Sequence, residues 1–218
     1  MLIKLILLFP FIGAIISGLF LKQISDKSSQ IINSSLIVLS AIFSTIIFFQ
    51  YGVTGIEDNI HIINWIKIGL FSADWSLKID SLSSVMLVVV TYVSSLVHIY
   101  SVGYMKGDKS IPRFMSYLSL FTFFMLILVT ADNFLQLFVG WEGVGLASYL
   151  LIGFYHNKLS ANLASMKAFI VNRVSDFGLI LAIALIFISF NSIEFSQIFA
   201  TMVIFPPHSI IFGDLTSI

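Results

Sequence analysis

The sequence has no cysteine among its 218 residues, and this absence excludes several kinds of chemistry. Without thiols, the chain can form no disulfide framework, offer no thiol nucleophile and ligate no iron–sulfur cluster or cysteine-bound metal. Its four histidines are scattered and show no metal-ligand spacing. We therefore expect no metal, no bound cofactor and no catalytic redox residue in this chain, so that any redox chemistry belongs to a partner.

Charged residues are also scarce. They make up 10% of the sequence, with 11 basic and 11 acidic residues and a formal net charge of +0. No basic stripe with interleaved aromatic residues occurs, so nucleic-acid binding has no electrostatic footprint. In contrast, 58% of the residues are hydrophobic, and the mean hydropathy is +1.03. This composition predicts an integral membrane protein surrounded by the lipid bilayer.

Long apolar stretches predict how the chain crosses the membrane. About six of them are long enough to span as helices, which predicts an all-α, multi-pass fold over residues 1–190. The first is longer than the core of a signal peptide, and no small-residue cleavage site precedes Lys22, so we interpret it as a mature helix. The stretches are Leu2–Leu21, Ile31–Tyr51, Ile79–Val102, Ile111–Ala131, Asn133–Tyr155 and Ala161–Phe190.

The connections between these stretches predict the orientation. One set of connections carries six basic residues and the other carries three, so the positive-inside rule places the N-terminus outside. On the outer face, residues 53–78 alternate apolar and polar side chains, which predicts a short hairpin or an interfacial segment. The tail, residues 191–218, contains Pro206, Pro207 and an apolar run too short to span. We expect it to lead toward a seventh helix that this sequence does not include.

Glu142 lies near the middle of the otherwise uncharged stretch Asn133–Phe154. A carboxylate at the centre of a membrane helix costs about 2.5 to 3.5 kcal/mol on insertion scales, and such acids are by default functional. Helical spacing places Gly145 and Tyr149 on the same face, where small residues allow another helix to approach. We interpret Glu142 as a group that exchanges a proton. The alternative is a structural hydrogen bond to a neighbouring helix.

The following apolar stretch contains three charged residues. Arg173 and Asp176 are three residues apart, so they can pair along one helix face and neutralise each other. Lys167 has no evident partner on its own helix. Because an amine in a low-dielectric site can gain and lose a proton near neutral pH, Lys167 is a second candidate for proton translocation. Alternatively, its side chain snorkels to the inner membrane surface.

Four further polar residues lie at helix ends or within the third stretch. Asp80 opens that stretch, where N-capping is sufficient to explain a carboxylate. His98 lies within an apolar run and either relays protons or is a neutral histidine bonded to a neighbouring helix. Asp132 and Asn133 predict the turn and the N-cap that begin the fifth helix.

Seven short motifs follow one another along the chain: Lys78–Ser83, His98–Met105, Ala131–Leu135, Gly140–Leu146, Ser148–Tyr155, Met166–Phe169 and Asn172–Asp176. Together they resemble the NuoL-type antiporter-like subunit (chain 5) of proton-pumping NADH:quinone oxidoreductase, respiratory complex I. The resemblance extends over roughly residues 1–195. It implies the first part of an antiporter-like helical bundle.

The resemblance also implies a function. Glu142 would be the essential acid of a proton path and would couple with a lysine on a later, broken helix. The chain would be a membrane-arm subunit that contributes part of a proton-translocation channel and couples quinone reduction to proton pumping. FMN, iron–sulfur clusters and quinone would be held by partner subunits of this enzyme. The other charged or titratable residues would modulate Glu142 or be secondary: Lys167, Arg173, Asp176, His98 and Asp80.

Members of that family are much longer than this sequence, which would lack their broken seventh helix, second inverted repeat and lateral helix. The expected partners are other membrane-arm subunits and a polypeptide that carries the missing C-terminal helices. The expected location is a mitochondrial inner membrane or a bacterial cell membrane. Two alternatives stay open: a large-subunit fragment of a multi-component sodium/proton antiporter, and an inactive truncated fragment.

Overall fold

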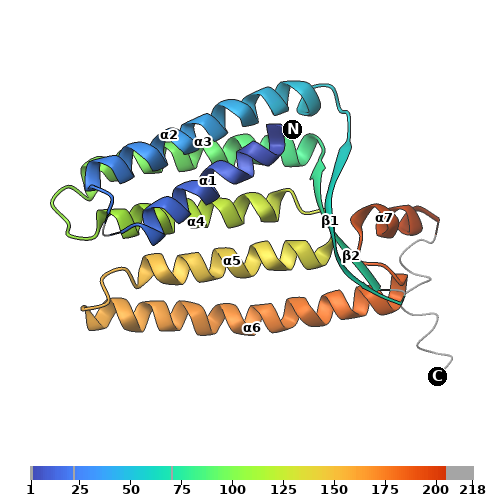
Figure 1. Ribbon diagram of the computed structural model, residues 1–218. Helices are drawn as coiled ribbons and strands as arrows, with labels where there is room; N and C mark the ends of the chain where they lie inside the picture. The colour runs from blue at the N-terminus through green and yellow to red at the C-terminus, as the bar shows by residue number, and fades with distance from the viewer. Residues whose placement is uncertain (1, 22, 70, 205–218) are drawn as a thin grey trace.

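A computed structural model describes residues 2–21, 23–69 and 71–204 (Figure 1). Within them, six helices are long and apolar enough to cross a membrane, as the sequence predicts. A π-helical turn, η1, extends the second of them. The elements are α1 (Leu2–Leu19), α2 (Asp26–Ile47), η1 (Phe48–Gly52), β1 (Asp58–Ile68), β2 (Phe71–Ile79), α3 (Ser81–Tyr104), α4 (Ile111–Val129), α5 (Phe134–Ile152), α6 (Leu159–Phe190) and α7 (Phe195–Ile204).

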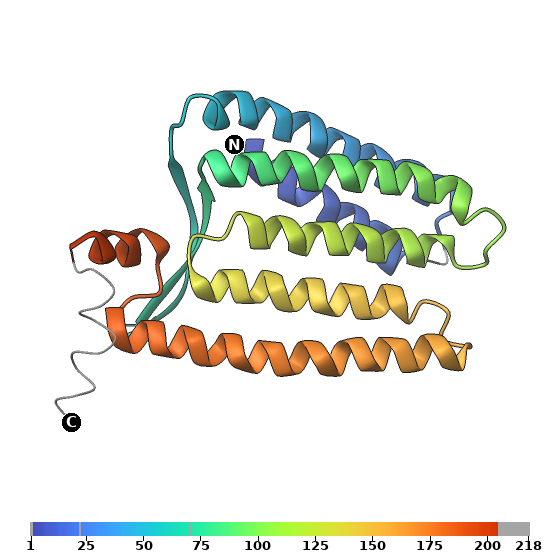
Figure 2. The same cartoon turned by 180° about the vertical axis from the view of Figure 1, so that it is seen from behind.

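The six long helices lie side by side, with α6 at one edge of the bundle (Figures 1 and 2). Helix α4 is central and packs against α1, α2, α3 and α5. Helix α5 lies between α4 and α6, and it is the main neighbour of α6. Only three described residues of α6 are buried: Ser165, Asp176 and Ile183. Glu142 on α5 and the charged residues of α6 therefore lie where the packed bundle meets a helix that has one open side.

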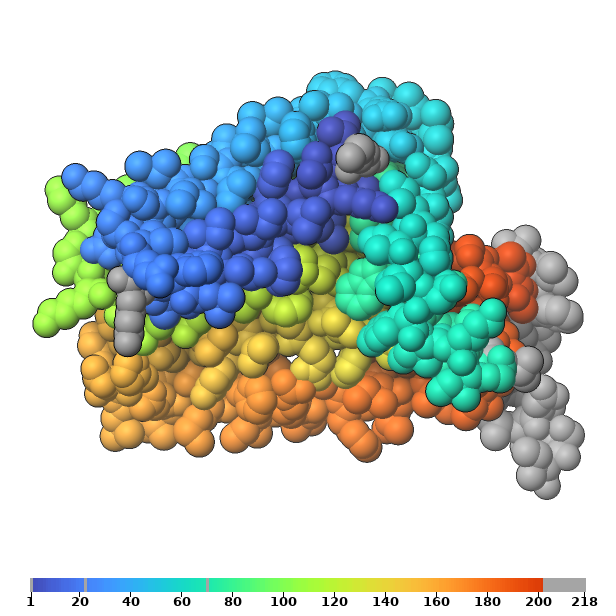
Figure 3. Space-filling model, in the orientation of Figure 1, coloured from blue at the N-terminus to red at the C-terminus, as the bar shows by residue number. Residues whose placement is uncertain are grey.

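The β-hairpin adds a small two-stranded sheet to the predicted helical fold, and it bears out the hairpin alternative for the outer connection. Strands β1 and β2 pair antiparallel over most of the outer connection, so the element is a long hairpin and not the short one expected. It crosses one end of the bundle, beside α7 (Figure 3). Asn133 at the start of α5 donates from Nδ2 to the Asp74 carbonyl at 2.7 Å, and Gln136 accepts from the Ser76 amide at 3.2 Å. These bonds attach β2 to the first turn of α5 and satisfy backbone groups that lipid could not satisfy.

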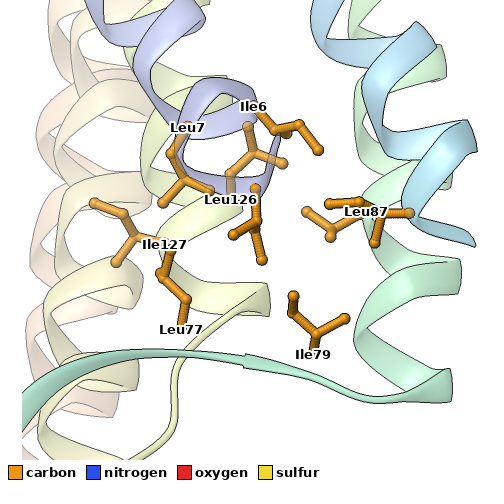
Figure 4. Close-up of a cluster of buried hydrophobic side chains, with 9 residues drawn as sticks. Ile6, Leu7, Leu77, Ile79, Leu87, Leu126 and Ile127 are labelled. Atoms are coloured by element: carbon orange, nitrogen blue, oxygen red, sulfur yellow. The ribbon is translucent and has the colours of Figure 1, made fainter. Parts of the chain in front are cut away.

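An apolar cluster lies where the hairpin meets the helices (Figure 4). Its buried side chains come from α1, α2, α3, α4 and β2, and they include Ile6, Leu77, Leu87 and Leu126. Because lipid is as apolar as these side chains, close packing contributes more here than removal from water does. The cluster fixes the end of α4, and with it the position of α5.

Capping residues set the helix boundaries near the site. Asn133 is the N-cap of α5 and accepts a hydrogen bond from the Gln136 amide at 2.8 Å, as predicted. Helix α6 ends at Phe190, and its C-cap residue Asn191 adopts a left-handed conformation with φ 51°.

The tail begins with an element that the sequence did not predict. Helix α7 has 10 residues, too few to cross a hydrocarbon core of about 30 Å. Lys22 and residues 205–218, with Pro206 and Pro207, lie outside the described residues, and so does the expected approach to a following helix. The C-terminal ends of α1, α3 and α5 and the N-terminal ends of α2, α4 and α6 share one end of the bundle (Figure 1). Which end faces outside stays a prediction.

Candidate functional site

Glu142 is in the middle of α5 and forms an ion pair with Arg173 of α6. Arg173 Nη1 donates to Oε1 at 2.5 Å and also contacts Oε2, so one guanidinium nitrogen serves both carboxylate oxygens. The side chain of Glu142 is 22% exposed and that of Arg173 is 43% exposed. Both charges are therefore compensated within the described chain, although Arg173 still faces the open side of the bundle.

The same guanidinium serves a second acid. Arg173 Nη1 is 3.6 Å from Asp176 Oδ2, which confirms the predicted pairing along α6. Asp176 is buried, and its Oδ1 accepts a hydrogen bond from Trp141 Nε1 at 2.9 Å. The Arg173 guanidinium also lies 4.5 Å from the centroid of the Phe169 ring, within cation–π range. Two carboxylates from two helices thus share a single cation.

Sequence reasoning missed two parts of this arrangement, the Glu142–Arg173 pair and the Trp141 bond. The pair could have been found, because α5 and α6 are joined by a short connection and must lie antiparallel. Glu142 and Arg173 are at comparable distances along the chain from that connection. Trp141 gives no such signal, since an indole beside a membrane acid is equally compatible with lipid contact.

Glycines on α5 determine which way Glu142 faces. A Cβ on Gly140 would lie 2.7 Å from the backbone of Leu128, and one on Gly143 would lie 2.1 Å from the Phe124 ring. Helix α4 therefore packs directly onto the glycine face of α5. A Cβ on Gly145, on the face shared with Glu142, would lie 3.6 Å from Asn172 Nδ2 of α6, an ordinary van der Waals contact. The close approach that small residues allow is therefore made by α4 at Gly140 and Gly143, and α6 does not need a glycine at position 145.

A polar cavity of about 220 Å³ opens between α4, α5 and α6 near the 153–158 connection. Tyr149, two turns from Glu142 on α5, is part of its wall, and the Tyr149 ring lies 5.3 Å from the Phe169 ring. The cavity therefore lies at the end of the bundle, two turns of α5 from Glu142, and neither Glu142 nor Arg173 lines it. Its polar lining residues are Arg113, Tyr117, Tyr149, His156, Asn162 and Ser165.

Lys167 is not part of this network. It is exposed on α6, and within the described residues no carboxylate lies at ion-pair distance from its amine. It is about 12 Å along the helix axis from the start of α6, at 1.5 Å per residue. Its proposed part in proton transfer, like the alternative of snorkelling, stays a prediction.

The two remaining candidates have other partners than Glu142 and Arg173. Asp80 caps α3, because its Oδ1 accepts from the Ser83 amide at 2.7 Å, and its carboxylate is 3.7 Å from Lys78 Nζ. This bears out the capping interpretation. His98 is completely buried in α3 and hydrogen-bonds Ser119 of α4, as the interpretation of a histidine bonded to a neighbouring helix expects. Among the described residues, no group of three or more His, Asp or Glu side chains is placed to hold a metal ion.

Two family models match the chain. "NADH-Ubiquinone oxidoreductase (complex I), chain 5 N-terminus" matches residues 65–115, and "NADH:quinone oxidoreductase/Mrp antiporter, TM" matches residues 131–216. The second range includes Glu142, Arg173 and Asp176. The glutamate pair and its surroundings therefore lie in the part of the chain that the antiporter model describes.

Curated relatives and solved structures agree with these matches. The chain is 53% identical to NADH-quinone oxidoreductase subunit L of Rickettsia bellii over 89% of its length, and 52% identical to NADH-ubiquinone oxidoreductase chain 5 of Chondrus crispus over 92%. It spans 30% of the length of each relative. The Mrp complex from Dietzia sp. matches 96% of this chain with a TM-score of 0.79 at 22% identity, covering 22% of that chain. An archaeal membrane-bound sulfane sulfur reductase matches 90% with a TM-score of 0.77 at 19% identity, covering 39% of that chain. The two structures establish the shared fold.

Proposed function

This chain belongs to the family of antiporter-like membrane subunits of NADH:quinone oxidoreductase, and we propose that it contributes the first part of a proton-translocation channel in which Glu142 exchanges the proton. One observation carries the proposal: a glutamate in the middle of a membrane helix shares a single guanidinium with a second, buried acid. Such an arrangement changes its charge balance when one proton is added or removed, which is the requirement for electrostatic coupling.

The mechanism follows from how Arg173 is shared. With Glu142 ionised, the guanidinium contacts both of its oxygens and stays 3.6 Å from Asp176. When Glu142 takes up a proton, its attraction for Arg173 falls, and the guanidinium moves toward Asp176. A charge shift elsewhere in the complex that draws Arg173 away from Glu142 would in turn favour proton uptake by Glu142. Quinone reduction in partner subunits would supply that shift, so this chain needs no redox group of its own.

The proposal requires partners. The chain spans 30% of the length of its Rickettsia and Chondrus relatives, and the side of α6 away from α5 carries exposed apolar residues such as Val174, Phe177 and Leu185. We propose that the helices missing from this chain, on the same or a separate polypeptide, pack on that side and complete the path with a second cationic residue. FMN, iron–sulfur clusters and quinone would belong to other subunits. The membrane would be a mitochondrial inner membrane or a bacterial cell membrane.

A sodium/proton antiporter subunit is the second candidate, because one matching family model is named for Mrp antiporters as well as for NADH:quinone oxidoreductase. Native electrophoresis of the source membranes, followed by mass spectrometry of the NADH-oxidising band, separates the two. Peptides of this chain in that band, together with peptides of the missing helices, would support the respiratory role. Absence from the band, with sodium-dependent growth at alkaline pH, would favour the antiporter. Absence from every membrane complex would indicate an inactive fragment.

The site itself is tested by Glu142→Gln. This change keeps the size of the side chain and one acceptor oxygen but removes the ionisable carboxyl group. In inside-out membrane vesicles, we expect the complex to assemble and to oxidise NADH with an artificial acceptor while NADH-driven acidification falls severalfold. Glu57→Gln, in an exposed position before β1, is the matched control and should acidify the vesicles normally. Full acidification by Glu142→Gln would refute the assignment.

A further inference from the structure

A second polar centre is buried in the other half of the bundle, among α1, α2, α3 and α4. His98 lies there with no exposed surface. Its Nε2 is 3.0 Å from Ser119 Oγ on α4, and its Nδ1 is 2.8 Å from the Ser94 carbonyl one turn earlier on α3. Ser119 Oγ is in turn 2.8 Å from Oδ1 of Asn33 on α2. These contacts form a continuous chain from α3 through α4 to α2.

Asn33 extends this series of hydrogen bonds to α1. Its amide nitrogen donates to the Ser29 carbonyl at 2.8 Å and to the Ser17 hydroxyl. These bonds orient the amide, because Nδ2 must face Ser17 and Ser29 while Oδ1 must face Ser119. The approach is close: a Cβ on Gly13 of α1 would lie 2.6 Å from Asn33 Oδ1. The Asn33 oxygen is therefore an acceptor held in a fixed direction.

A count of the hydrogen atoms available to these hydrogen bonds shows that two arrangements of the Ser119 hydroxyl compete. The carbonyl of Ser94 can only accept from Nδ1 of His98. The Ser94 hydroxyl is also 3.3 Å from Nδ1, but it gives its hydrogen to Thr122, whose own hydrogen goes to the Leu118 carbonyl. Nδ1 must therefore carry a hydrogen. Asn33 Oδ1 can also only accept, so it requires the single hydroxyl hydrogen of Ser119. If the imidazole is neutral, its Nε2 has no hydrogen and requires that same hydroxyl hydrogen. Only when the imidazole is protonated can all three bonds be made at once.

In the part of the chain that the structure describes, the groups that contact His98 are uncharged. Among the described residues, its hydrogen-bond partners are Ser94 of its own helix and Ser119 of α4, and Ser94 Oγ is bonded to Thr122 Oγ1 of α4 at 2.6 Å. From α2, the group that faces the chain is the amide of Asn33. The described polar groups around His98 are thus hydroxyls, a carbonyl and an amide, whereas Arg173 has carboxylates beside it.

We propose that His98, Ser119 and Asn33 form a second proton-holding site, in which protonation of the imidazole rotates the Ser119 hydroxyl from His98 to Asn33. In the neutral state the hydroxyl donates to Nε2, and Asn33 Oδ1 loses its partner on α4. In the protonated state Nε2–H donates to Ser119, and Ser119 donates to Asn33. The proton goes no further, because an amide that donates to Ser17 and Ser29 cannot pass it on. The site therefore stores a proton and couples it to the contact between α2 and α4. This inference does not depend on the role of Glu142.

The test follows the ring nitrogens of histidine by ¹⁵N NMR in the full chain, labelled on histidine and reconstituted in lipid nanodiscs. The signal of His98 is the one missing from a His98→Gln variant. At high pH we expect hydrogen on Nδ1 and an Nε2 that accepts a hydrogen bond, and at low pH we expect hydrogen on both nitrogens. The titration is repeated on Ser119→Ala, Asn33→Ala and the control Ser116→Ala. Ser116 is a buried serine one turn from Ser119 that bonds the Ala14 carbonyl instead.

Ser119→Ala and Asn33→Ala should both lower the midpoint pH of His98 by about one unit, a tenfold loss of proton affinity, because bonds to a charged donor are stronger than neutral ones. The Asn33 variant is decisive, since Asn33 does not touch the imidazole and acts only through Ser119. Ser116→Ala should leave the midpoint unchanged. Two results from the parent chain would overturn the proposal: a neutral His98 with its hydrogen on Nε2, or no doubly protonated His98 at low pH while the chain stays helical. Two results from the variants would also overturn it: an unchanged His98 midpoint in Asn33→Ala, or a shift in Ser116→Ala as large as that in Asn33→Ala.

Discussion

Replacing Arg173 with glutamine tests the shared cation of the Glu142 site most directly. The change removes the positive charge that compensates Glu142 and Asp176 but keeps a side chain of similar reach. Since both acids contact the same Nη1 atom, their oxygens lie within a few ångströms of each other. In Arg173→Gln the two carboxylates face each other without a cation, and one of them must take up a proton or move away.

The magnitude can be bounded from the geometry. At 3.6 Å and an effective dielectric constant of 20, one ion pair has a Coulomb energy of about 4 to 5 kcal/mol. Desolvation of the charges offsets most of this energy. The 43% exposure of Arg173 reduces it further, since a partly exposed pair is screened. We expect a net loss of about 1 to 2 kcal/mol, which is about a tenfold change in the balance between the two charge states.

The assay compares acidification per NADH oxidised in inside-out vesicles. Arg173→Gln should reduce this ratio severalfold, and Arg173→Lys should fall between it and the parent, because an ammonium keeps the charge but not the planar fork. The double variant Arg173→Gln with Asp176→Asn should recover part of the loss. It removes the second unpaired acid, and asparagine still accepts the Trp141 hydrogen bond. Normal acidification in Arg173→Gln, or a double variant worse than the single one, would refute the idea of two acids sharing one cation.

Three further predictions concern the elements that hold the site. Gly143→Ala should destabilise the chain by about 1 to 3 kcal/mol, because its Cβ would lie 2.1 Å from the Phe124 ring of α4. Gly178→Ala on α6 is the control and should be tolerated, because no described atom lies within 4 Å of its Cβ. Thermal unfolding in detergent compares the two variants. Asn133→Ala should cost about 2 kcal/mol, because it removes both the cap of α5 and the bond to β2, and faster amide exchange in the hairpin would report the loss. Burial, and then the charge of Asp132, raises the pKa of Glu194 in the connection before α7. A raised acid pKa lowers stability as pH rises through it, so Glu194→Gln should be more stable than the parent at pH 7 and lose that advantage below the ordinary pKa of about 4.5. Equal pH dependence of the two melting temperatures would contradict this.

The helical pattern was predictable because the bilayer imposes it. A chain in lipid must satisfy its backbone hydrogen bonds within each segment, so long apolar runs become helices whatever surrounds them. All six predicted spans are present for this reason. Helix α7 was missed because a short apolar segment is compatible with a helix, a strand or a loop. The hairpin was left open because alternating residues at a membrane surface are equally compatible with an interfacial segment.

The sequence by itself determined the class of protein and the number of spans, and it singled out Glu142 as the candidate acid, because each depends on local composition and on the cost of charge in lipid. It also determined the pairing of Arg173 with Asp176, which needs only helical spacing. Only the tertiary structure decided that Arg173 reaches across to Glu142, and that Asn33 and Ser119 connect His98 to two other helices. Those contacts depend on the rotation of each helix about its axis. That rotation is set by glycine contacts such as those of Gly140 and Gly143, which no single segment reveals.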